Sequence, residues 1–263
     1  MKRAAVVLAA LILAVLVIAG LSGSASAANP VPLPVALQSG AVFATQKPPS
    51  VLVSPAWTAA LNEPGQCKSN PSQVSLNSSG FAQLSTNGKF GNCAPAESPH
   101  TYPTKPGYIY EARVNASTLL NWDAFWQFGS NWPDQGEIDA FEPQFGTNYV
   151  SWHFASCGQG AASSTKSTDP FTYPCKTTVR PAGANIGTGW HTIDIAYTST
   201  AVDTYYDGHL YAHVPETLTA STSDPMWIVF GASSCAQPQD NTCAPGGNGK
   251  AGNLQVAWLR IWT

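Results

Sequence analysis

Residues 201–214 read AVDTYYDGHLYAHV, two runs of β-branched and aromatic residues joined by Asp207 and Gly208. An Asp-Gly pair favours the type I′ turn, whose left-handed backbone matches the twist of two antiparallel strands. The stretch therefore predicts a two-residue β-hairpin, 201–206 paired with 209–214.

Short apolar or alternating runs of the same kind recur along the chain on either side of this hairpin, with turn residues between them. They are GFAQLST (80–86), GYIYEARVN (107–115), NWDAFWQFG (121–129), GEIDAFE (136–142), NYVSWHFAS (148–156), GWHTIDIAYT (189–198), PMWIVFGAS (225–233) and NLQVAWLRIWT (253–263). Many short strands without a convincing helix are typical of an all-β protein. We expect residues 51–263 to form a single-domain β-sandwich of two antiparallel sheets.

The charge composition limits the kinds of macromolecule that the protein can bind. Only 10% of the 263 residues are charged, 44% are hydrophobic and nine are tryptophan, with a formal net charge of -3. The 12 Lys and Arg residues are scattered, so the chain lacks the basic patch that binds a polyanion. We therefore expect no nucleic-acid partner.

The N-terminus resembles an export signal. Lys2 and Arg3 precede an apolar run, and Ala25-Ser26-Ala27 matches a cleavage site for a secretory signal peptide. The alternative is an uncleaved membrane anchor, because the run is close to the ~20 residues that span a bilayer. We expect residues 1–27 to be a signal peptide, 28–50 to be a Pro-rich arm, and the mature protein to be secreted and free of the membrane.

Six cysteines follow the expected signal peptide, an even number that favours disulfides in an exported chain. Six cysteines allow 15 pairings. Each neighbouring couple brackets a polar loop, and none has the spacing of a zinc site. This arrangement favours the pairs Cys67–Cys93, Cys157–Cys175 and Cys235–Cys243.

The run GEIDAFE concentrates three carboxylates, Glu137, Asp139 and Glu142, in a chain with only 15 acidic residues. In a regular strand Glu137 and Asp139 share a face and Glu142 points away. A β-bulge at Ala140-Phe141 would return Glu142 to the same face. The two glutamates could then approach the ~5 Å carboxyl separation of a retaining glycosidase. The alternative is that they are solvent-facing residues on opposite sides of an edge strand.

The motif and its surroundings resemble glycoside hydrolase family 16, in the subset that carries E-x-D-x-x-E. The resemblance extends from about residue 72 to 263 and includes Gly136, Trp132-Pro133 and the flanking strands. It implies a concanavalin-like jelly roll with a catalytic groove on its concave face. It also implies that Glu137 is the nucleophile, Asp139 the assisting residue and Glu142 the general acid and base.

Two positions depart from the family pattern. Asp123 stands where relatives commonly have Pro, and we expect this change to alter the groove. Ala257 stands where relatives often have a calcium-binding Asp, which argues against a structural calcium ion. We expect no cofactor. His191, Asp194 and Asp203 do not form a metal-ligand set, and we interpret them as surface residues.

Four further residues are candidates for contact with sugar. Trp132, Trp126 and Trp122 lie close to the motif, and tryptophan rings offer apolar faces to sugar rings. The alternative is a place in the core, which is the more common position for any single tryptophan of a sandwich. His153 follows in the next run, where relatives often have a histidine near the cleft; a satisfied core histidine is the alternative.

The sequence as a whole predicts a secreted, monomeric, endo-acting glycosidase that cleaves a β-linked polysaccharide, β-1,3-glucan or a related glucan or galactan, with retention. A non-catalytic lectin-like sandwich is one alternative, because the same architecture serves carbohydrate-binding proteins. Transglycosylation, in which a sugar hydroxyl replaces water, is another.

Overall fold

The computed structural model describes residues 52–58, 68–69, 71–87, 92–119, 121–129, 136–144, 147–154, 175–179, 187–215, 225–233 and 251–263. All of these belong to one compact unit, Val31–Thr263. The expected signal peptide and the arm to residue 50 lie outside the described residues, so both stay predictions. Within the described part of the chain, no helix is long and apolar enough to cross a membrane.

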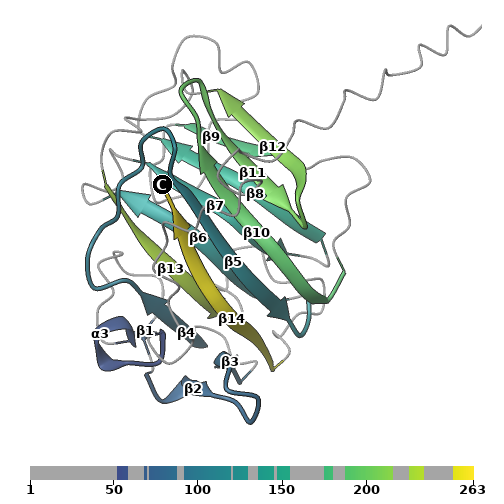
Figure 1. The fold of residues 1–263 in the computed structure, drawn as a ribbon. Coiled ribbons are helices and arrows are strands. Elements are labelled where there is room, and N and C mark those ends of the chain that lie inside the picture. Colours follow the sequence, from purple (N-terminus) through teal and green to yellow (C-terminus); the bar gives the residue numbers. More distant parts are fainter. Residues whose placement is uncertain are drawn as a thin grey trace, which may run out of the picture. The chain divides into compact units, whose positions relative to one another are not determined.

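Strands account for nearly all of the regular structure (Figure 1). Only two short helices are described, α3 (Pro55–Thr58) and the 3₁₀ turn η1 (Pro71–Gln73). The strands are β1 (Lys68–Ser69), β2 (Val74–Leu76), β3 (Ala82–Thr86), β4 (Asn92–Glu97), β5 (Ile109–Ala116), β6 (Trp122–Gly129), β7 (Glu137–Gln144), β8 (Thr147–Phe154), β9 (Cys175–Val179), β10 (Gly189–Tyr197), β11 (Ala201–Tyr206), β12 (His209–Pro215), β13 (Met226–Ser233) and β14 (Gly252–Trp262).

The strands form two seven-stranded sheets, as the sequence predicted for a sandwich. Sheet I has the order β1-β4-β13-β6-β7-β8-β9, and sheet II has the order β12-β11-β10-β5-β14-β3-β2. Every pairing is antiparallel except the two-residue contact between β1 and β4, which is parallel. Neither sheet closes on itself.

The inner faces of the two sheets bury one hydrophobic core. Alternate residues of each strand belong to it, such as Ile193 and Ile195 on β10 and Ile228 and Phe230 on β13. The rings of Phe125 and Phe230 stack across neighbouring strands with centroids 4.9 Å apart. Burial of this period-2 set drives the two sheets together.

The hairpin predicted at Asp207-Gly208 is confirmed. Both residues have positive φ, 48° and 80°, as a type I′ turn requires. Tyr206 pairs directly with His209 across the two-residue connection. The side chain of Asp207 accepts a hydrogen bond from the amide of Thr192 at 2.9 Å, which ties the turn to β10.

Two tyrosine hydroxyls carry hydrogen bonds from sheet II into sheet I. Tyr197 of β10 donates to Oε1 of Gln127 on β6 at 2.7 Å. Tyr206 of β11 donates to the backbone carbonyl of Ala140 on β7. Both bonds are buried, so they satisfy polar groups that would otherwise be costly to bury.

One cysteine side chain is described. Cys93 is buried on β4 and is not a free thiol. Its expected partner, Cys67, lies outside the described residues, as do the side chains of the other four cysteines. All three pairings therefore stay predictions.

Asp123 does not face the groove, and the expectation that it alters the groove is wrong. It lies on β6 opposite Ala232, on the side that buries Phe125 in the core. Its side chain is fully buried, and neither carboxyl oxygen has a hydrogen-bond partner. Desolvation raises the pKa of Asp123 well above its usual range, which favours a neutral acid in the core.

We expect Asp123→Asn to stabilise the protein more as the pH rises. Because the folded-state pKa is raised, the unfolded chain loses this proton above about pH 4 while the folded protein keeps it, and stability falls. Asparagine removes that penalty, with a gain on the order of 1 to 3 kcal/mol at pH 7. Urea unfolding of parent and variant at pH 3 and pH 7 measures this gain in the free energy of unfolding. An equal gain at both pH values would contradict the raised pKa of Asp123.

Candidate functional site

Strand β7 contains a bulge at the position that the sequence predicts. Asp139 pairs with Ser151 and Glu142 pairs with Tyr149, so Ala140 and Phe141 together face the single residue Val150 of β8. The pairing with β6 shifts at the same place. The predicted bulge at Ala140-Phe141 is confirmed.

The bulge places two successive residues on the core side of β7. Ala140 and Phe141 both belong to the inter-sheet core, as does Ile138. Asp139 and Glu142 pair with β8 residues two positions apart, so they share the opposite face with Glu137. We call this outward side of sheet I the carboxylate face.

Large aromatic rings lie beside the carboxylates on this face. Phe128 is opposite Glu137 and Trp126 is opposite Asp139. The ring of Phe128 stacks on Trp126 and on Trp227 of β13, with centroids 5.1 Å apart in both cases. Trp126 and Phe128 are buried, whereas Trp227 is partly exposed.

The three carboxylates differ in their contact with solvent. Asp139 is 4% exposed and Glu142 3% exposed, while Glu137 is partly exposed. A fourth acid, Glu97 of β4, is fully buried opposite Val229 in the same cross-strand row as Trp126 and Asp139. The face therefore groups one partly exposed carboxylate with three buried ones.

Of the four candidate sugar-contacting side chains, the structure describes that of Trp126. Trp126 lies on the carboxylate face, largely buried in the ring cluster. His153 occupies the register position opposite Glu137, and Trp122 the position opposite Ser233, but their side chains lie outside the described residues. Trp132 lies outside them entirely.

Sequence reasoning missed Phe128 and Trp227 as part of this face. In PMWIVFGAS, Trp227 and Val229 alternate with Met226, Ile228 and Phe230, a pattern that assigns them to opposite faces. Which of those faces carries the carboxylates depends on the pairing of β13 with β6.

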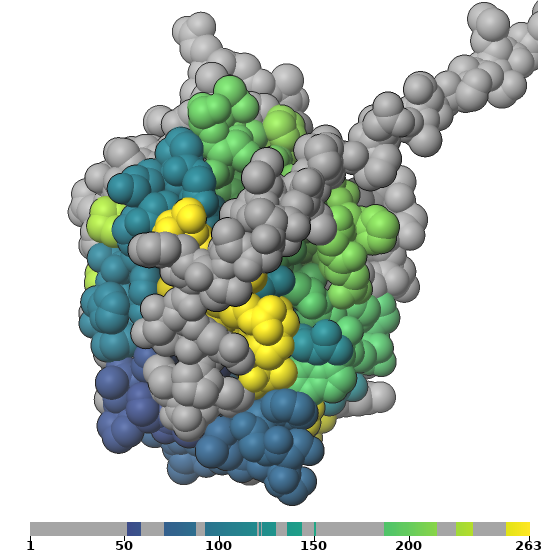
Figure 2. Space-filling model, viewed as in Figure 1, coloured from purple at the N-terminus to yellow at the C-terminus, as the bar shows by residue number. Residues whose placement is uncertain are grey.

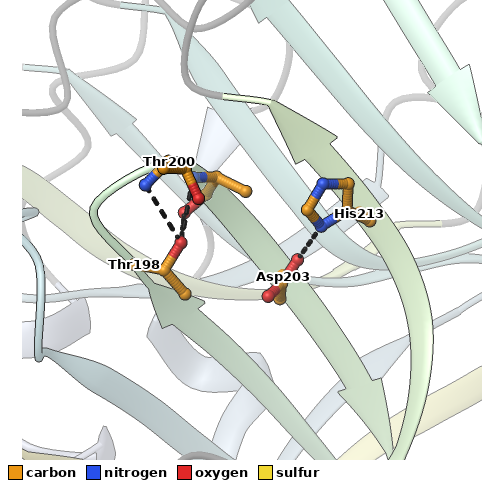
Figure 3. A network of polar contacts seen from close by, with 5 residues as sticks. Thr198, Thr200, Asp203 and His213 are labelled. Carbon is orange, nitrogen blue, oxygen red and sulfur yellow. Dashed lines mark hydrogen bonds and ion pairs between the residues drawn. The ribbon is translucent and has the colours of Figure 1, made fainter. Parts of the chain in front are cut away.

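The outward face of sheet II, on which β14 (yellow in Figure 2) reaches the surface, carries a second group of acids. Glu111 accepts a hydrogen bond from Nε1 of Trp262 at 3.1 Å and lies 3.6 Å from the Arg260 guanidinium. Asp203 of β11 lies 2.7 Å from Nδ1 of His213 on β12, beside the turn that Thr198 caps (Figure 3). These acids have basic or indole partners.

Asp194 and Asp203 are buried, at 2% and 5% exposure, and their interpretation as surface residues is wrong. Burial raises the pKa of Asp194 to about 8, and the nearby carboxylates of Glu111 and Asp207 add to the effect. Burial also raises the pKa of Asp203, which His213 opposes. Among the described residues no group of His, Cys, Asp or Glu could hold a metal ion. The three carboxylates of GEIDAFE lie on the other sheet, sheet I.

Comparison with known proteins identifies the family. A family model described as "XgeA-like, catalytic GH16 domain" matches residues 82–222, which include β7 and most of both sheets. A search of curated proteins finds no significant match.

Solved structures share the fold. One, from work on endo-acting O-glycanases of the human gut microbiota, has a TM-score of 0.57 at 17% identity, covering 72% of this chain and 82% of that one. A non-specific endo-β-1,3(4)-glucanase of family GH16 has a TM-score of 0.54 at 15% identity, covering 84% of each chain. A pseudo β-1,3-glucanase of Mycobacterium tuberculosis has a TM-score of 0.51 at 17% identity, covering 75% and 81%. Such low identities show the fold alone.

Proposed function

Because the chain belongs to glycoside hydrolase family 16, we propose that it is a secreted endo-acting glycosidase that cleaves a β-linked polysaccharide with retention. The observation that carries the proposal is the bulge of β7, which groups Glu137, Asp139 and Glu142 on one face. A retaining glycosidase uses two carboxyl groups that flank the scissile bond, and the carboxylates on this face offer such a pair.

In the first step a carboxylate oxygen of Glu137 attacks the anomeric carbon. The glycosidic C–O bond breaks, and the leaving oxygen takes the proton of Glu142. The product is a glycosyl ester on Glu137. Asp139 lies between the two on the same face and is 4% exposed; its proposed role is to orient them.

In the second step Glu142, now a carboxylate, takes a proton from water. The water oxygen attacks the anomeric carbon, and the bond to Glu137 breaks. Two inversions at one carbon retain its configuration. If a sugar hydroxyl replaced water, the same step would be transglycosylation.

The substrate class follows from the face and the family. The described part of the carboxylate face is aromatic and acidic, so it suits a neutral glycan better than a polyanionic one. Because glucanases are among the proteins with a similar fold, we propose a β-1,3-glucan or a related glucan or galactan as the substrate. Trp132, Trp122 and His153 remain proposed contacts with that chain.

One set of experiments tests retention, the role of Glu137 as nucleophile and the role of Glu142 as acid and base. The first-formed sugar, followed by proton NMR, should have the anomeric configuration of the substrate. Glu137→Gln should abolish hydrolysis of every substrate. Glu142→Gln should slow the hydrolysis of substrates with poor leaving groups by about 100-fold or more. It should slow the hydrolysis of activated aryl glycosides far less, because their leaving groups need little protonation.

An inverted first product would overturn the assignment of Glu137 as nucleophile. Reducing-sugar release from a panel of glucans and galactans provides the parent activity. A protein that binds one of these glycans but cleaves none would be a lectin-like sandwich, and the enzymatic proposal would be abandoned.

We further propose that Trp227 stacks on a sugar beyond the cleavage point. Its ring is the partly exposed member of the aromatic cluster, and β13 is separated from β7 by β6 alone. Two strand spacings place it roughly 10 Å from the carboxylates. That separation exceeds the width of a single sugar ring, so short substrates would not reach it.

Trp227→Ala should weaken binding of long oligosaccharides about 3- to 10-fold, the value of one aromatic stacking contact, and leave short ones unchanged. Calorimetric titration in the Glu142→Gln background measures affinity without turnover. Trp258→Ala, a partly buried tryptophan on sheet II, is the matched control. Equal losses for long and short ligands would remove Trp227 from the binding surface.

Secretion is also part of the proposal. The N-terminal signal pattern and the even number of cysteines support it, since disulfides persist in oxidising compartments. Thiol titration of the denatured, unreduced mature protein should detect essentially none of the six cysteines. Six reactive thiols would contradict both the disulfides and the secretion that they support.

A further inference from the structure

Tyr206 reaches the bulge of β7 from the opposite sheet. Its hydroxyl donates a buried hydrogen bond to the backbone carbonyl of Ala140, the first residue of the bulge. A regular strand directs its carbonyls within the sheet, toward its neighbours. A bulge disrupts the ladder locally, and here the carbonyl of Ala140 is satisfied by a side chain from the core.

The ring of Tyr206 packs against a second tyrosine. Tyr211 stacks on it, with centroids 4.0 Å apart and planes 30° from parallel. Tyr211 is itself the extra residue of a bulge in β12, because Thr204 pairs with Ala212 and Tyr205 with Leu210. The tyrosine pair therefore joins the irregular point of β12 to that of β7.

The backbone of Tyr206 is fixed as well. It is the last residue of β11, opposite Ile193 of β10. The next residue, Asp207, donates its amide to the carbonyl of Thr192 at 2.8 Å and accepts the Thr192 amide at 2.9 Å through its side chain. The hydroxyl of Tyr206 is thus presented from a rigid end of the hairpin.

We propose that Tyr206 is a positioning residue: it fixes the bulge and thereby the direction in which Glu142 leaves β7. Glu142 follows the held carbonyl by two residues. Because side chains alternate with a period of two, a change of one residue in the pairing at the bulge would move Glu142 to the opposite face. This inference rests on the proposed role of Glu142 as acid and base.

Tyr206→Phe removes the hydroxyl and keeps the ring stack. We expect kcat on a polysaccharide to fall about 10- to 100-fold with KM unchanged, because a small misplacement of a reacting group has effects of this size. The fall in kcat on activated aryl glycosides should be much smaller, since their cleavage depends little on protonation by Glu142.

Tyr197→Phe is the matched control. It removes the other inter-sheet hydroxyl bond, to Gln127 of β6, which is equally buried but does not contact the bulge. Its melting temperature should fall about as much as that of Tyr206→Phe, with kinetics unchanged. Equal kinetics in the two variants, or equal losses on both substrate types, would overturn the positioning role.

A second measurement is independent of activity. The carbonyl ¹³C shift of Ala140 and amide exchange at Phe141 and Glu142 should change in Tyr206→Phe and remain unchanged in Tyr197→Phe. If the parent cleaves no glycan, the proposed function fails, and these signals still show whether Tyr206 holds the bulge. Unchanged signals would overturn the inference.

Discussion

One extra residue in one strand is the constraint on which the site depends. The bulge turns both Ala140 and Phe141 into the core and returns Glu142 to the face of Glu137 and Asp139. Without it, the period of two would direct Glu142 into an apolar interior, where an isolated charge is very costly. The same irregularity therefore satisfies the packing of the core and the grouping of the carboxylates.

The sandwich supports this irregular strand from both neighbouring strands and from the opposite sheet. β7 lies between β6 and β8 near the centre of sheet I, so the bulge cannot widen without disturbing two ladders. Tyr206 crosses the core to bond the carbonyl of Ala140. The precision of the site thus depends on residues that do not reach its surface, as preorganised sites require.

Both outward faces bury acids. On sheet II, Arg260 and Trp262 contact Glu111 and His213 contacts Asp203, while Asp194 lies near the carboxylates of Glu111 and Asp207. On the carboxylate face, the acids are grouped with one another and with aromatic rings. This combination of grouped carboxylates and aromatic rings is the observation on which the proposed function rests.

The amino-acid sequence by itself determined the all-β fold, the hairpin at Asp207-Gly208 and the bulge at Ala140-Phe141. Each depends on local rules, the turn preference of two residues or the period of two along one strand. Tertiary structure decided the burial of Asp194, the inward direction of Asp123, and the places of Trp227 and Tyr206. These depend on which distant strands become neighbours and on which side of each sheet faces the core. Pairing between residues 66 positions apart, as for Tyr206 and Ala140, leaves no periodic trace in either segment.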